Sequence, residues 1–295
     1  MTKVTILTLS IVAATLIGCS DSDNYTSNNN PSQIVKGELL DINESNQDKV
    51  LASSLSVFKL DDALNSTGAD LRLTNEVDEK VYANEVLKLT LSKRVESHNC
   101  QSGKVTVDDN ENGVNKDLDV DFENCTNNGI TIDGLIHYNT ITDAKNLDAV
   151  ATNLKVSKDD KEVFYEDATL KIQDGNISET LTGYAKDGNK SVTFKDFKID
   201  IKKLSSLTKY SVDGALATSC IDNKWLDIKT TQDVEKNATL DCPTAGVVEI
   251  KGDDNSTIKA EYKNDQSINI YLDGNLTKTY SSCDEMSSDV EAECK

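Results

Sequence analysis

The sequence predicts a mainly β fold, an antiparallel meander that forms either a sandwich or a curved open sheet. Residues 117–122 alternate carboxylates with Leu, Val and Phe, which is typical of a strand with one buried face. Tight-turn pairs of Asp, Gly and Asn, which tolerate positive φ, recur along the chain. Strands joined by such turns at intervals of about ten residues indicate a meander.

Further alternating stretches support this prediction, and they lie at residues 168–172, 192–201, 247–250, 258–262 and 268–272. The expected turns lie at residues 133–134, 174–176, 187–189, 213–214 and 273–275. Within the longest stretch, the alternation changes phase between Phe194 and Phe197. A single extra residue in a strand has this effect, so we expect a β-bulge there.

The segment 37–95 is expected to be a small N-terminal element that mixes helix and strand. Asn46 or Asp48 could cap a helix whose apolar positions are Leu51, Leu55 and Phe58. Residues 77–89 are a second helical candidate, although part of this segment also alternates like a strand. The β-rich body is then expected over residues 96–295.

The first residues of the chain have the pattern of an export signal. Lys3 precedes an apolar run over residues 6–17, which is shorter than the roughly 20 residues that span a bilayer. The run ends in Leu-Ile-Gly-Cys at residues 16–19. We therefore expect residues 1–18 to be a signal peptide, and an ordinary signal followed by a chance cysteine is the alternative.

This ending resembles the lipobox of bacterial lipoproteins with a type II signal peptide. The resemblance implies cleavage before Cys19, lipid on its sulfur and on the new amine, and a membrane as partner through this anchor. Ser20 is similar to the residue that directs such lipoproteins to the outer membrane, on its periplasmic or its surface face. Residues 19–36 are polar and aperiodic, and we expect a lipidated, disordered tether.

With Cys19 assigned to lipid, an even number of cysteines remains: Cys100, Cys125, Cys220, Cys242, Cys283 and Cys294. In an oxidising compartment this predicts three disulfides. Short separations along the chain favour the pairs 100–125, 220–242 and 283–294. Zinc ligation is the alternative, but the chain has no CxxC pair and no adjacent pair of histidines.

The β-rich body resembles a duplication of two cysteine-pair units, at about residues 96–215 and 216–295. The segment from Cys125 to Gly134 is similar to the segment from Cys242 to Gly252, and another cysteine precedes each of them. The shared scheme would be a disulfide-closed hairpin that leads into a second hairpin. The alternative is that both segments arrived independently at the same turn residues.

One candidate metal site binds calcium. Asp108, Asn110, Asn112 and Asp119 match the oxygen-ligand spacing of an EF-hand loop. The last position is Asp where that loop has Glu, and the flanking segments look like strands. The alternative is a solvated hairpin tip, and no other cofactor is predicted.

Six asparagines match the stricter acceptor motif of the bacterial oligosaccharyltransferase family, D/E-x-N-x-S/T. They are Asn43, Asn176, Asn189, Asn237, Asn255 and Asn275. The motif predicts surface glycan attachment. The alternative is that hairpin turns favour the same residue types.

The remaining features argue against an enzyme. His98 and His137 are the only histidines, and no nucleophile, nucleotide or metalloprotease motif occurs. The net charge of −20 disfavours nucleic acid and anionic lipid as partners. Trp225 is the only tryptophan, and we expect it in the core of a two-sided strand rather than as an exposed ligand platform.

The sequence therefore predicts a lipid-anchored, disulfide-braced and non-enzymatic module of the cell envelope. Its role would be binding or structural, and its partner, protein or glycan, is left open. The alternatives are a lipid or lipoprotein carrier with a half-barrel fold and a calcium-dependent adhesive module.

Overall fold

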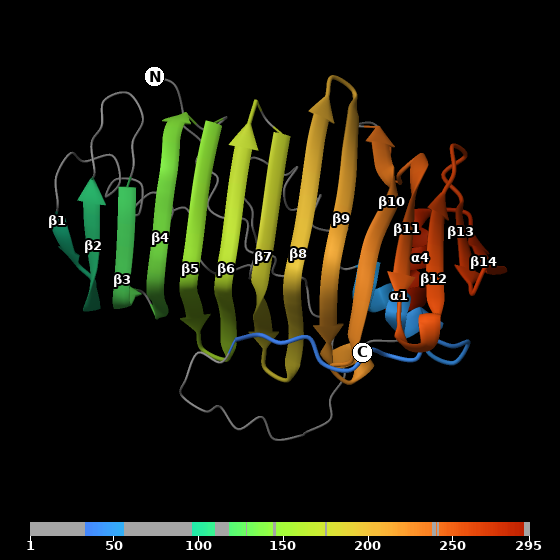
Figure 1. Ribbon diagram of the computed structural model, residues 1–295, viewed down its shortest axis with the longest axis horizontal. Coiled ribbons are helices and arrows are strands. Elements are labelled where there is room, and N and C mark those ends of the chain that lie inside the picture. Colours follow the sequence, from blue (N-terminus) through green and yellow to red (C-terminus); the bar gives the residue numbers. More distant parts are fainter. Residues whose placement is uncertain are drawn as a thin grey trace.

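The computed structural model describes residues 33–55, 96–109, 118–127, 129–143, 146–174, 176–237, 240 and 242–291. Within these ranges fourteen strands form one antiparallel sheet, in which every strand pairs with its neighbours in the sequence (Figure 1). The meander predicted from the sequence is thus confirmed, and it takes the form of an open sheet.

The strands are β1 (Glu96–Asn99), β2 (Ser102–Asp109), β3 (Leu118–Asn127), β4 (Ile130–Asp143), β5 (Asn146–Lys158), β6 (Lys161–Gln173), β7 (Asn176–Asp187), β8 (Lys190–Leu204), β9 (Leu207–Thr218), β10 (Trp225–Asn237), β11 (Ala245–Lys251), β12 (Thr257–Tyr262), β13 (Ile268–Leu272) and β14 (Asn275–Tyr280). The helical elements are α1 (Gln47–Leu55), α4 (Cys283–Glu291) and the 3-10 turns η1 (Ser219–Ile221) and η2 (Asp253–Asn255).

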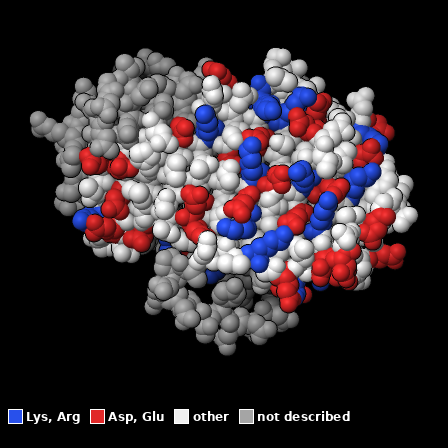
Figure 2. Space-filling model, in the orientation of Figure 1, with Lys and Arg blue, Asp and Glu red and all other residues white. Residues whose placement is uncertain are grey.

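The sheet has one apolar face, which we call the inner face, and one polar face, the outer face. In β3, Leu118, Val120 and Phe122 are buried while Asp121 between them is exposed, as the alternating sequence predicts. Figure 1 shows α1 and α4 behind the strands β10 to β14, on the inner side. Figure 2 shows lysines interleaved with carboxylates over the opposite side of the same strands.

The predicted N-terminal helix is confirmed as α1. The carbonyl of Asn43 accepts a hydrogen bond from the Gln47 amide, and the Asn46 side chain accepts one from the Asn43 amide. Val50 and Leu51 are fully buried against the core, so the helix packs through its apolar side. The helix ends at Leu55. The predicted helical positions at 58 and 77–89 lie outside the described residues.

The predicted bulge in β8 is confirmed. The pairing of β8 with β9 shifts register between Lys195 and Lys198, and Asp196 has a φ of 46°. The extra residue lets both Phe194 and Phe197 point to the inner face, where their rings meet edge to face at 5.2 Å.

Two of the five predicted turns are wrong, because Asp133-Gly134 lies inside β4 and Asp213-Gly214 lies inside β9. Both glycines face a bulge on a neighbouring strand rather than a turn: Gly134 faces β5 and Gly214 faces β8. A Cβ on Gly214 would lie 2.5 Å from Phe197 Cα, and its φ is +149°. The other three predicted turns, after β6, β7 and β13, are confirmed.

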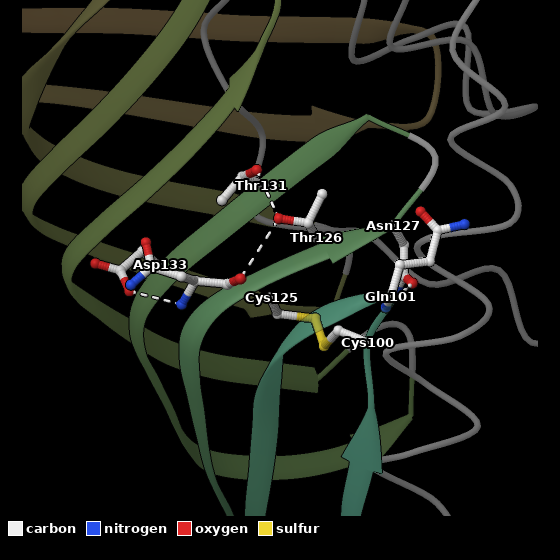
Figure 3. Close-up of a disulfide and its surroundings, with 8 residues drawn as sticks. Cys100, Gln101, Cys125, Thr126, Asn127, Thr131 and Asp133 are labelled. Atoms are coloured by element: carbon white, nitrogen blue, oxygen red, sulfur yellow. Dashed lines mark hydrogen bonds between the residues drawn. A yellow bond between two sulfur atoms is a disulfide. The ribbon is translucent and has the colours of Figure 1, made fainter.

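Asp133 supports a bulge of its own. Its carboxylate accepts a hydrogen bond of 2.9 Å from the amide of Asn124, which has a φ of 47° in β3. Figure 3 shows Asp133 together with the disulfide that joins Cys100, in the turn between β1 and β2, to Cys125 of β3. This disulfide confirms the first predicted pair.

The other two predicted pairs are wrong, because Cys242 bonds to Cys283, 41 residues away. The sequence argument used separation along the chain, whereas α4 follows β14 and its first residue, Cys283, returns to the segment before β11. Cys220 is disulfide-bonded as well, and Cys294 lies outside the described residues. The second hairpin of the proposed duplication is therefore not closed by its own cysteine pair, and the proposed boundary at residues 215–216 falls inside β9.

We expect Gly214→Ala to destabilise the protein by about 2–4 kcal/mol, because the new Cβ meets backbone atoms and the backbone conformation disfavours an L side chain. Gly274→Ala is the control, since its φ is also positive (+81°) but a Cβ there would touch nothing within 4 Å. Urea unfolding measures both. Equal losses in the two variants would contradict the proposed close packing of glycine against the bulge.

Candidate functional site

Residues 33–42 form a strap that crosses the outer face near one end of the strands and then leads into α1 (Figure 1). The strap pairs with the start of β10, since the Trp225 amide donates to Glu38 and the Leu40 amide donates to the Trp225 carbonyl. Farther along, the amide of Asp253 donates to the Leu40 carbonyl. Backbone hydrogen bonds therefore hold the strap in register with the sheet.

Trp225 fills the space between the strap and the sheet. It is 7 % exposed and packs with Ala215 and Ala217 of β9, and Ile34 and Leu39 of the strap lie against this cluster. The adjacent Leu226 is buried on the inner face, so β10 is buried on both sides here. The prediction that Trp225 is a core residue of a two-sided strand is confirmed.

Polar contacts fix the course of the strap. Lys36 forms an ion pair of 2.6 Å with Asp227, and Lys224 pairs with Glu38. The amide of Ile34 donates to the carboxylate of Glu166 in β6. Residues 33–36 therefore lie against the sheet, although the sequence places them in a disordered tether. Two scattered apolar residues anchor the strap, and such spacing gives no periodic signal.

Among the described residues, Glu179 of β7 is the one buried carboxylic acid, and it belongs to the inner face. It is 2 % exposed, and its cross-strand partners on the two sides are Leu170 and Ile199. Its Oε1 has no hydrogen-bond partner. Burial raises the pKa of Glu179 to about 8, so the group is largely protonated at neutral pH.

A second unpartnered polar atom, the hydroxyl of Tyr165 in β6, belongs to the same face. Burial raises the pKa of Tyr165 well above its ordinary value, and the nearby Glu179 carboxyl raises it further. A neutral carboxylic acid and a phenol can each donate and accept a hydrogen bond. The sequence carried a signal for this site, because Ile177, Glu179 and Leu181 alternate and so share one face.

The calcium candidate is only partly within the described residues. Asp108 and Asp119 are cross-strand partners in β2 and β3, while Asn110 and Asn112 lie outside the described part of the chain. Asp119 already binds another group, because its Oδ1 lies 2.6 Å from Nδ1 of His137. In the portion of the chain that the structure describes, no three His, Cys, Asp or Glu side chains are grouped to hold a metal.

The two histidines do not meet in a catalytic arrangement. His137 lies half-exposed on β4 with Asp119, and the backbone of His98 belongs to β1, two strands away from β3 and three from β4 in the strand order.

All six candidate glycan acceptors are within the described residues, in turns, loops or at the ends of strands. Five are exposed, and Asn237 at the end of β10 is partly buried. Some amides stabilise turns, since Asn43 Oδ1 accepts from Ser45 and Asn176 Oδ1 accepts from the Lys203 amide. The same asparagines are thus accessible to a transferase and, in part, needed for turn formation. Glycan attachment stays a prediction.

No protein family, curated protein or solved structure matches the chain. Among the described residues, no helix is both long and apolar enough to cross a membrane. Cys19 lies outside the described residues.

We expect Trp225→Ala to cost about 3–5 kcal/mol, because it empties the space between strap and sheet. Lys36→Ala should cost less than about 1 kcal/mol, since both partners of its ion pair are about one-third or more exposed (34 % and 43 %). Urea unfolding gives both values. A loss of similar size in the two variants would show that charge, rather than apolar packing, holds the strap.

The raised pKa of Glu179 predicts that its contribution to stability falls as pH rises. Between the ordinary value of 4.5 and about 8, the folded chain keeps a proton that the unfolded chain has released. The free energy of unfolding of the natural protein should therefore decrease, relative to Glu179→Gln, by about 1.4 kcal/mol for each unit by which the two pKa values differ. Above pH 8 the difference should be constant.

The measurement is urea unfolding from pH 4.5 to 9, with Glu249→Gln on the outer face as the matched control. If the Glu179→Gln and natural proteins keep parallel pH profiles, the carboxyl is not held neutral in the folded state.

Proposed function

We propose that this protein is a non-enzymatic, lipid-anchored binding module of the cell envelope, tethered to the outer membrane through Cys19. The observation that carries the proposal is the strap, since it fixes the first described residues of the body firmly onto the sheet. A pull on the N-terminal segment would be met by backbone hydrogen bonds at Trp225 and by its apolar packing.

The length of the intervening chain supports a close tether. Residues 20–32 separate Cys19 from the strap, and a chain of this length reaches at most about 45 Å. A body attached in this way stays near the membrane surface. The net charge of −20 and the interleaved charges of the outer face disfavour direct contact with anionic lipid (Figure 2).

The disulfides support an oxidising compartment. Cys100–Cys125 and Cys242–Cys283 join segments 25 and 41 residues apart, and such bonds persist outside the reducing cytosol. Of the alternatives, the calcium-dependent module is less well supported, because His137 engages the Asp119 carboxylate. The interior polar pair of Glu179 and Tyr165 favours binding over a purely structural role.

Two variants test the anchor. Cys19→Ala should abolish incorporation of radiolabelled palmitate and should move the protein from the membrane to the soluble fraction, because the thiol that accepts the lipid is gone. Ser20→Asp should keep the label but retain the protein in the inner membrane. Cys220→Ala, which leaves the lipobox intact, is the control for effects of cysteine loss. Palmitate labelling that persists in Cys19→Ala would refute the proposal.

A further inference from the structure

Among the described residues, four buried side-chain atoms have no hydrogen-bond partner: two belong to Gln47 and Asp48 of α1, and two belong to Tyr165 and Glu179 of the sheet. Glu179 is 2 % exposed and Tyr165 is also 2 % exposed, and neither the Glu179 Oε1 nor the Tyr165 hydroxyl has a partner. Buried polar groups in native proteins are nearly always hydrogen-bonded, because desolvation without a partner costs free energy. Two such atoms on neighbouring strands indicate that something else supplies the hydrogen bonds.

The surroundings of the pair are hydrocarbon. Leu170 and Ile199 flank Glu179 across the two neighbouring strands, and Leu154 pairs with Tyr165 on the other side. All three are buried apolar side chains. The helices lie behind β10 to β14, farther along the sheet from β6 and β7 (Figure 1). Tyr165 lies opposite Gly183, four residues from Glu179 along β7, so the two side chains form an extended polar patch within an apolar face.

We infer that Glu179 and Tyr165 form the polar end of an internal binding site for an amphiphile with a long apolar chain and an uncharged hydrogen-bonding head. Apolar side chains along the inner face would contact the chain, and the carboxylic acid and the phenol would bind a hydroxyl, ester or amide. This inference deepens the binding function proposed above and rests on it.

The charge of the head follows from the site. A carboxylate or phosphate would have to lose its water beside an acidic group, and the apolar strands offer no cation on this face to either side of Glu179. An ammonium head would have to form an ion pair in hydrocarbon, where desolvation opposes the attraction. A neutral head requires neither the desolvation of a charge nor an ion pair. The Glu179 carboxylic acid and the Tyr165 hydroxyl can each donate a hydrogen bond to it or accept one from it.

The test uses native mass spectrometry of the full-length chain, purified in detergent at pH 7, with monoolein as the neutral probe and oleate as its anionic match. We expect one monoolein per chain and at least about tenfold weaker binding of oleate. Glu179→Leu should weaken monoolein binding about tenfold or more, whereas Glu179→Gln, which still donates and accepts, should stay within about threefold. Tyr165→Phe should also weaken binding.

Glu249→Leu on the outer face is the matched control and should bind like the natural protein. Thermal unfolding followed by circular dichroism verifies that each variant is folded. The inference is overturned if no monoolein adduct forms, if Glu179→Leu binds as the natural protein does, or if oleate binds more tightly than monoolein. Spectra of the same samples under denaturing conditions remove bound probe and show only covalent lipid, so a failed anchor and a failed binding site give different results.

Discussion

The strands β2 to β13 must present buried apolar side chains to the same face, even though several strands contain an extra residue. Without a bulge, one extra residue would move every later side chain of that strand to the opposite face of the sheet. In β8 the bulge at Asp196 does this, and Gly214 on β9 lets the bulged backbone approach closely. The same arrangement joins Asn153 of β5 to Gly134 of β4. These pairs keep the inner face continuous, and every other feature of the molecule is placed relative to that face.

The two faces of the sheet differ in the interactions that their side chains form. The outer face carries ion pairs such as Lys155–Glu162 and Lys209–Glu235, which contribute little to stability because water screens them. Such a face keeps a broad sheet soluble. Where the strap crosses it, Trp225 turns a small part of the same face into a second core. Apolar packing thus buries the contact between the strap and the sheet, and the stability of this contact does not depend on charge.

The inner face combines buried apolar side chains with an acidic group, Glu179, whose Oε1 has no hydrogen-bond partner. An apolar residue of similar volume in place of Glu179 would raise the free energy of unfolding, because a buried polar group without a partner lowers stability. Stability alone therefore does not explain this residue. A ligand that brings its own hydrogen-bonding group and an apolar chain would explain both Glu179 and Tyr165.

The sequence by itself determined the strands β3, β6, β8 and β11 to β13, the phase change at Phe194–Phe197, the helix after Asn46 and the core position of Trp225, because each follows from local alternation or capping. It also determined the Cys100–Cys125 pair, because only 25 residues separate the two cysteines along the chain. Only the tertiary structure decided that Gly134 and Gly214 serve bulges, that Cys242 bonds to Cys283, and that residues 33–36 lie on the sheet. It also placed Glu179 and Tyr165 on the same face of the neighbouring strands β7 and β6. These features depend on contacts between segments far apart in the chain or on neighbouring strands, and local residue patterns contain no information about which distant backbone will approach.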